Sequence, residues 1–308
     1  MVFGFMHFMV FADEGAISLL ERHEELRRVT RVEHFIDDEG YHEDVQKRQL
    51  FERYFFELFS NADFETESLS KLSSDDKRLL YGDVFNAVFW TQDIRAVGAF
   101  EKLVRALRSE GEISQRDVAR SMGLINRTGE FERVRKGLVE YGINNASTYP
   151  EISRKFGLSS PYKGGVVDVW RVRDGGRRLV LEQVSRPNNQ VVMVMSLQGC
   201  SSSQVALEEI ASDAQLNAFF KEHGQILSAP VAAFNFQDFA EWNERQEGME
   251  AFLVNKMADW SEIRTWATPS FYFYKKGELV DYQVGWKDKE TLKEAINNYL
   301  GFNHEVQR

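Results

Sequence analysis

Cysteine is nearly absent from this chain of 308 residues, in which Cys200 is the single one. One cysteine excludes an intrachain disulfide and any zinc or iron–sulfur site that needs several thiolates. Proline is scarce as well, with 5 residues, which argues against a disordered or collagen-like chain. Positive charge is in deficit, because 38 Lys and Arg stand against 48 Asp and Glu, giving a formal net charge of -10. That charge repels nucleic acid and anionic lipid, so neither is an expected partner.

A hydrophobic run long enough to cross a bilayer is also lacking, and no integral membrane segment is expected. Residues 1–12 are almost wholly apolar. Their length suits the middle of a secretory signal, and Val10 and Ala12 occupy the positions that signal peptidase reads. This interpretation predicts a periplasmic or secreted protein. Because no Lys or Arg precedes the run, the alternative is a buried hydrophobic element in a cytoplasmic protein.

The length predicts two domains, and the first, residues 13–145, has the apolar spacing of helices throughout. Helices are expected at Leu19–Val29, Leu50–Leu58, Leu79–Val88, Ile94–Ser109, Ser114–Met122 and Thr128–Tyr141. We expect Ser73 to cap the third helix, and Gly123 and Gly142 to end the last two. The pattern breaks over residues 146–165, where Asn, Ser, Pro and Gly accumulate, and a linker is expected there.

In residues 166–308 the apolar period changes to two, which is typical of strands. A hairpin is expected over Val166–Val184 with its turn at Gly175 and Gly176. The expected elements then follow as a strand at Val191–Leu197, a helix from Ser201, a strand at Ile226–Ala233, helices within Phe236–Trp260, a hairpin at Phe271–Val284 and a helix at Lys289–Leu300.

Residues 190–302 resemble the thioredoxin superfamily. The likeness rests on a cysteine at the first strand-to-helix junction, on the run from Thr268 through Pro269 into an apolar strand, and on Gly285 after the hairpin. It implies a thioredoxin fold with a cis peptide bond before Pro269. The hairpin that precedes it is similar to the extra strands of exported branches of the superfamily. The expected fold class is therefore α+β, with an all-helical domain before an α/β thioredoxin-like domain.

The active motif of that family is Cys-x-x-Cys, and here the matching residues are Cys200 to Ser203. By resemblance Cys200 is the nucleophile, Ser203 stands at the resolving position, Pro269 faces the sulfur, and the backbone of Thr268 pairs with a bound peptide. Without a second thiol, dithiol oxidation or reduction within one site is excluded. The sequence departs further at Gly199, where many members have an aromatic residue, and at Val194, where a buried carboxylate often assists proton transfer.

A cysteine in the first turn of a helix has a stabilised thiolate, which is the form that attacks disulfides. The sequence therefore predicts monothiol exchange or isomerisation with protein or peptide thiols and disulfides, with no cofactor and no metal. One alternative is a small buried hydrophobe at position 200 in a non-catalytic scaffold or chaperone-like module. Another is a peroxide-reducing monothiol, for which Thr268 or Arg264 would polarise the peroxide.

Three further patterns have plainer explanations. Ala119 and Gly123 have helix-turn-helix spacing, but two packed helices need such a turn for structural reasons alone. A polar segment resembles a metal site, but its spacing fits no zinc or calcium motif. Its members are His34, Asp37, Asp38, Glu39, His42 and Glu43. Aromatic residues near Pro269 could line a peptide groove or simply pack on a strand face. These are Trp266, Tyr272, Tyr274, Tyr282 and Trp286.

Overall fold

The computed structural model of the chain describes residues 18–30, 44–143, 149–154, 165–197, 199–231 and 234–301, with side chains left out for 44–47. The apolar segment 1–12 lies outside these residues, as do all six residues of the metal-like cluster between His34 and Glu43. The predictions made for both therefore remain predictions.

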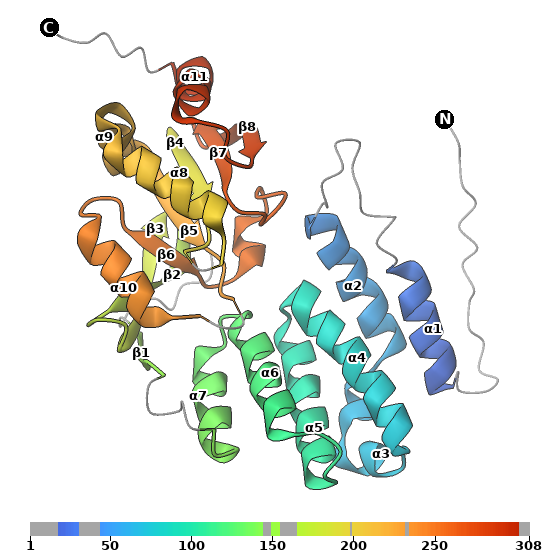
Figure 1. The fold of residues 1–308 in the computed structure, drawn as a ribbon. Helices are drawn as coiled ribbons and strands as arrows, with labels where there is room; N and C mark the ends of the chain where they lie inside the picture. Colours follow the sequence, from blue (N-terminus) through green and yellow to red (C-terminus); the bar gives the residue numbers. More distant parts are fainter. Residues whose placement is uncertain are drawn as a thin grey trace, which may run out of the picture.

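Helices are the only regular secondary structure in the described residues up to 143, where a helical domain is expected (Figure 1). Their bounds are α1 Leu19–Val29, α2 Asp44–Leu58, η2 Asn61–Phe64, α3 Thr66–Ser70, α4 Ser74–Thr91, α5 Ile94–Ser109, α6 Gln115–Asn126 and α7 Phe131–Glu140. At the start of several of these helices an N-cap side chain accepts a backbone N–H. At the start of α4 the Ser73 hydroxyl accepts a hydrogen bond from the backbone N–H of Asp76, as predicted. The helices enclose a core of their own that includes Phe55, Leu80 and Phe100.

An eight-stranded mixed sheet dominates the rest of the chain. Its strands are β1 Glu151–Arg154, β2 Val166–Arg173, β3 Arg178–Ser185, β4 Gln190–Val194, β5 Gly224–Ser228, β6 Ala251–Val254, β7 Ser270–Lys275 and β8 Glu278–Val284. They lie in the order β1-β3-β2-β6-β5-β4-β7-β8. Strands β4, β5 and β6 are parallel, whereas β7 and β8 form the expected antiparallel hairpin. The α+β fold class is confirmed.

Alternate residues of the central strand β4 serve two different cores. Val191 and Met193 pack with the helices α8 Ser201–Ser212, α9 Ala214–His223, α10 Phe236–Arg245 and α11 Lys289–Leu300. Val192 and Val194 point to the opposite face, where they pack with Trp260 and Ile263. Every residue of β4 after the first is therefore buried, which explains its continuous apolar sequence.

The chain from β4 to α11 forms the expected thioredoxin-like arrangement. A parallel pair, β4 and β5, is connected through α8 and α9, and an antiparallel hairpin is followed by a closing helix. The earlier hairpin, β2 and β3, pairs antiparallel with β6 and widens this sheet. Its turn includes Gly175 and Gly176, both with positive φ, as the sequence predicts.

Three local expectations are wrong. Strand β6 lies within Phe236–Trp260, where only helices are expected, because its four residues are too few to display a period. Strand β1 forms inside the expected linker and pairs parallel with β3. Helix α6 continues through Gly123 to Asn126, so no turn occurs there and the helix-turn-helix interpretation fails. The helix expected from Ser201 is present as α8, and a second helix, α9, follows it with the Asp213 carboxylate as its cap.

The aromatic side chain of Phe131 connects the helical part to the α/β part. Phe131 begins α7, yet it is 1% exposed and belongs to the core of the α/β part. Its ring centroid lies 5.5 Å from that of Trp170 and 5.9 Å from that of Phe236, in edge-on geometry in both cases. The two parts of the chain therefore share a hydrophobic core at this point.

Polar and close backbone contacts extend this interface at the ends of strands β5 and β6. In Figure 1 the helical part lies below and to the side of the sheet. Gln92 Nε2 donates to Met257 Sδ at 2.8 Å, and Asn126 Nδ2 donates to the Val231 carbonyl at 2.8 Å. Gly129 lies so close to Asn255 that a Cβ atom there would be 2.5 Å from its carbonyl oxygen. Val231 follows β5 and residues 255–257 follow β6. The helical part therefore abuts the carboxyl ends of the parallel strands.

Candidate functional site

Cys200 lies at the same carboxyl ends of the parallel strands, because the residue follows strand β4 in the chain. Cys200 is the N-cap residue of α8, with extended backbone dihedrals, and its side chain is partly exposed. The preceding Gly199 has φ of +73°, a conformation that favours glycine and that explains why an aromatic residue is absent there. The sulfur is therefore both at a helix start and within reach of solvent.

The backbone of Thr268, the residue before Pro269, contacts the sulfur. The Cys200 thiol donates a hydrogen bond to the Thr268 carbonyl, with 3.2 Å between Sγ and O. The Thr268–Pro269 peptide bond is cis. The Gly285 N–H donates to the Pro269 carbonyl at 2.8 Å, so the segment after β8 closes on the same turn. Cys200, Thr268, Pro269 and Gly285 thus form one cluster.

Ser203 contacts Cys200 from the next turn of α8. It is fully buried, and its hydroxyl oxygen accepts the backbone N–H of Ser196 at 3.2 Å. A hydroxyl that accepts one hydrogen bond retains its own proton to donate. Ser203 therefore offers the sulfur a donor at the position of the second thiol in a Cys-x-x-Cys motif.

The surroundings of Cys200 favour the thiolate. Burial raises the pKa of Cys200, but hydrogen bonds from the side chains of Ser203 and Thr268 oppose it. The backbone N–H groups of Ser203 and Ser202 lower it further, and the pKa of the thiol lies below its ordinary value. Their effect is that expected at a helix N-terminus, where amide donors point at the anion. The hydroxyl of Ser201, an exposed residue, is not among these donors.

Replacing Ser203 by alanine is expected to raise the pKa of Cys200, because the variant loses the hydroxyl that donates to the thiolate. Alkylation by iodoacetamide should become slower near neutral pH, with an unchanged plateau rate at high pH where the thiol is fully ionised. The pH profile of the rate measures this. The exposed Ser201→Ala variant is the matched control and should keep the wild-type profile; identical profiles for both variants would contradict the assignment.

The aromatic residues around Pro269 divide into two groups. Tyr272 and Tyr274 are 0% and 2% exposed and belong to the core, so of the two alternatives both residues follow strand-face packing and neither lines a groove. The hydroxyl of Tyr272 donates to the Thr265 carbonyl at 2.6 Å. Trp266, Tyr282 and Trp286 are partly exposed, and Trp286 adjoins Gly285. The surface near the cis peptide bond therefore keeps only these three aromatic residues.

Arg264 does not contact Cys200 in the part of the chain that the structure describes. Its guanidinium lies over the ring of Tyr282, 5.4 Å from the centroid. Of the two side chains expected to polarise a peroxide, only Thr268 is in contact with the sulfur. The geometry gives less support to peroxide reduction than to disulfide exchange.

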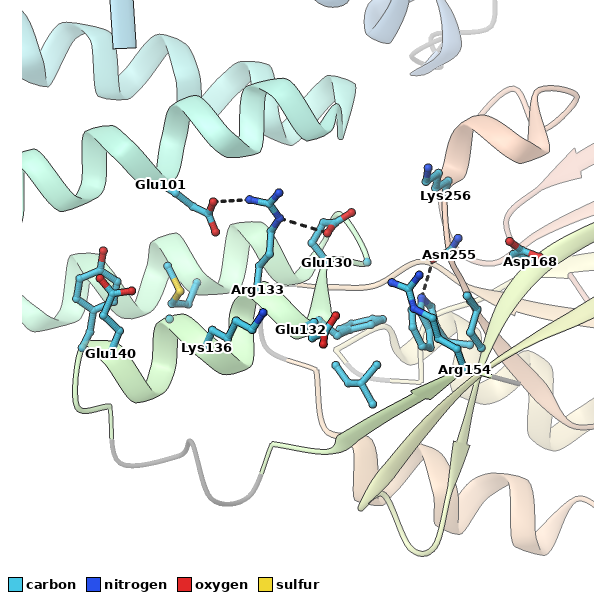
Figure 2. A pocket seen from close by; sticks show the side chains of 18 of the residues that line it. Glu101, Glu130, Glu132, Arg133, Lys136, Glu140, Arg154, Asp168, Asn255 and Lys256 are labelled. Atoms are coloured by element: carbon cyan, nitrogen blue, oxygen red, sulfur yellow. Dashed lines mark hydrogen bonds and ion pairs between the residues drawn. The ribbon is translucent and has the colours of Figure 1, made fainter. Parts of the chain in front are cut away.

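A cleft of ≈ 920 Å³ separates α5 and α7 from the sheet (Figure 2). Apolar side chains of Phe131, Trp170 and Leu181 line part of it. Its charges are balanced, five acidic against five basic. These are Glu101, Glu130, Glu132, Glu140 and Asp168 against Arg105, Arg133, Lys136, Arg154 and Lys256. Several are paired with each other, as Arg133 is with Glu101 at 2.6 Å. The cleft has the size of a ligand pocket but no excess charge that selects a ligand class.

Membrane-spanning helices and metal clusters are both lacking among the described residues. No helix in the described part is both long and apolar enough to cross a membrane. Within the same residues, no group of three or more His, Cys, Asp or Glu side chains could hold a metal ion. The geometry at Cys200 therefore remains the main candidate for chemistry in the described part of the chain.

No protein family and no curated protein matches this chain. Among solved structures it is similar to the crystal structure of a thioredoxin-like protein from Bacteroides caccae. That match has 11% sequence identity and a TM-score of 0.29, over 91% of this chain and 93% of the other. A likeness this weak carries no argument, and the thioredoxin-like arrangement rests on the topology and on the contact between Cys200 and Thr268 described above.

Proposed function

We propose that this protein is a thioredoxin-like thiol–disulfide exchange protein of the monothiol type, acting through Cys200 on polypeptide partners. The contact of the Cys200 sulfur with the Thr268–Pro269 turn, at the start of α8, is the observation that carries the proposal. The lowered pKa of Cys200 supports it, because the thiolate is the attacking species. Localisation to the cell envelope is part of the proposal and rests on the signal-like pattern of residues 1–12.

The exchange balances without an added oxidant. The Cys200 thiolate attacks one sulfur of a partner disulfide, an S–S bond forms between them, and the other sulfur leaves as a thiolate that takes up a proton. A thiol of the same partner, or of another molecule, then attacks the mixed disulfide and releases Cys200. Ser203 cannot attack in place of a second thiol, so the mixed disulfide persists until an external thiol arrives. Rearrangement of existing disulfides fits this chemistry better than net oxidation or reduction.

Ser203 and the cis turn take separate roles in this proposal. Ser203 stabilises the leaving or attacking thiolate by donation from its hydroxyl. Thr268 offers backbone groups beside the sulfur, to which an extended partner segment could pair as an added strand. The helical part, which abuts the same edge of the sheet, would act in recognition or tethering.

The test is disulfide rearrangement in a model peptide that carries a non-native disulfide, followed by mass spectrometry. We expect the wild-type protein to form a mixed disulfide with the peptide, and Cys200→Ser to form none and to lose all exchange. Ser201→Ala, which alters an exposed hydroxyl in the same turn, should retain exchange. A Cys200 thiol that resists alkylation in the native protein, or a Cys200→Ser variant with full function, would overturn the proposal in favour of a non-catalytic scaffold. Rapid sulfenic acid formation at Cys200 without exchange would favour peroxide reduction instead.

A further inference from the structure

Met257 differs from the other methionines of the described residues in its exposure. Met122, Met193, Met195 and Met249 are each 3% exposed or less, whereas Met257 is only partly buried. It begins the short helix η4, Met257–Trp260, which follows β6. Oxidants reach an exposed thioether more readily than a buried one. Met257 is therefore the most exposed methionine residue of the described part of the chain.

The sulfur of Met257 lies in the contact between the helical part and the sheet. Gln92 ends α4, where its backbone has φ of +52°, and its side-chain amide reaches across to Met257. The distance between Nε2 and Sδ is 2.8 Å. Beyond the contact, Met257 packs at the margin of the core that contains Trp260 and Ile263. The Met257 side chain thus links the end of α4 in the helical part to η4 in the α/β part.

We propose that Met257 is an oxidation site and that its sulfoxide opens the contact between the helical part and the sheet. The oxidant class is a hydroperoxide. A sulfur lone pair attacks one peroxide oxygen, an S–O bond forms and the O–O bond breaks. The sulfur is oxidised by two electrons, and the leaving oxygen is protonated to water or an alcohol.

Gln92 Nε2 lies directly against the sulfur in this contact. An N–H···O hydrogen bond has about 2.7 to 3.2 Å between its heavy atoms. A sulfoxide oxygen that took over the amide donor would need that distance between itself and Nε2, so the sulfur and Gln92 must move apart. Oxidation also converts a flexible apolar side chain into a polar one at the margin of a hydrophobic core.

Peptide mapping after treatment with hydrogen peroxide tests the first step. The full chain is used in a Cys200→Ser background, so that the thiol does not consume the oxidant. In the folded protein we expect Met257 to be oxidised several-fold faster than Met122, Met193, Met195 and Met249. In denaturant all five should react at similar rates. A Met257 that reacts no faster than the buried four in the folded protein overturns the proposal.

Hydrogen exchange tests the second step. Oxidation should raise the exchange of backbone amides at the end of α4 and in η4. Met257→Leu, which keeps an apolar side chain of similar size, should show no such rise after the same treatment. Gln92→Ala, which removes the partner of the sulfur, should show the rise without any oxidant. Oxidation of Met257 with unchanged exchange at both segments would overturn the opening of the contact.

Discussion

Phe131→Ala is expected to lower the free energy of unfolding by about 3–5 kcal/mol, the usual cost of removing a buried phenylalanine. The ring is 1% exposed and lies between Trp170 and Phe236, so the truncation leaves a cavity in the α/β core although the residue belongs to α7. Denaturant unfolding followed by Trp fluorescence measures the loss. Because the side chain joins the two parts of the chain, we also expect the transition to become less cooperative.

Two control variants separate these effects. Val139→Ala alters an exposed residue of the same helix, 66% accessible, and should change stability by less than about 0.5 kcal/mol. Phe100→Ala removes a fully buried ring that belongs to the helical core alone. It should cost as much as Phe131→Ala but raise hydrogen exchange in the helical part first. A Phe131→Ala protein with wild-type stability would show that the ring does not hold the two parts together.

Gly129→Ala is expected to destabilise the interface between the two parts of the chain. The residue has φ of +75°, and a Cβ there would lie 2.5 Å from the backbone oxygen of Asn255. An alanine in this conformation costs about 1–3 kcal/mol, and the overpacked contact with a backbone atom adds about 1–3 kcal/mol. The loss should appear in denaturant unfolding and as faster amide exchange after β6.

Gly111→Ala is a matched control for this variant, because Gly111 also has φ of +75° but nothing lies within 4 Å of an added Cβ. It should show the cost of the backbone conformation alone. The difference between the two variants then measures the contact with Asn255. Equal destabilisation by both would mean that the interface yields to the methyl group at no cost.

Much of this fold follows from local sequence. Capping by Ser73 and the period of the helices predict the helical part, and the glycine turn at residues 175 and 176 predicts the β2–β3 hairpin. The continuous apolar run of β4 and the change of pattern at Cys200 predict the central strand and helix α8. These features are decided by residues close together in the chain, and a single sequence displays them.

The elements that were missed depend on distant partners. Strand β6 has four residues and exists because β5 and β2 lie on either side of it. Strand β1 forms on the edge of β3 for the same reason. Tyr272 and Tyr274 have the composition of a binding surface, but their burial follows from the pairing of β7 with β4 and β8. Short apolar segments such as Ala251–Val254 are a weak signal that could have suggested a strand.

The candidate site was predictable in its members but not in its setting. The positions of Cys200, Ser203, Thr268 and Pro269 follow from resemblance in a short motif. The hydrogen bond from the Ser203 hydroxyl to the sulfur, and the one that the Ser203 oxygen accepts from the Ser196 N–H, depend on the fold and are not visible in the sequence. The proximity of the helical part to the same edge of the sheet depends on Gln92, Asn126 and Gly129, and nothing in their local sequence indicates a partner more than a hundred residues away.

The place of Phe131 also constrains the order in which a nascent chain can mature. Helix α7 emerges from the ribosome before Trp170 has emerged and before Phe236 has been translated, so the ring of Phe131 is at first not covered by either neighbour. The N-terminal helices can pack around their own core, but the contact between Phe131 and α10 forms only after α10 has been synthesised. Until then the exposed ring of Phe131 is a hydrophobic site to which a chaperone could bind.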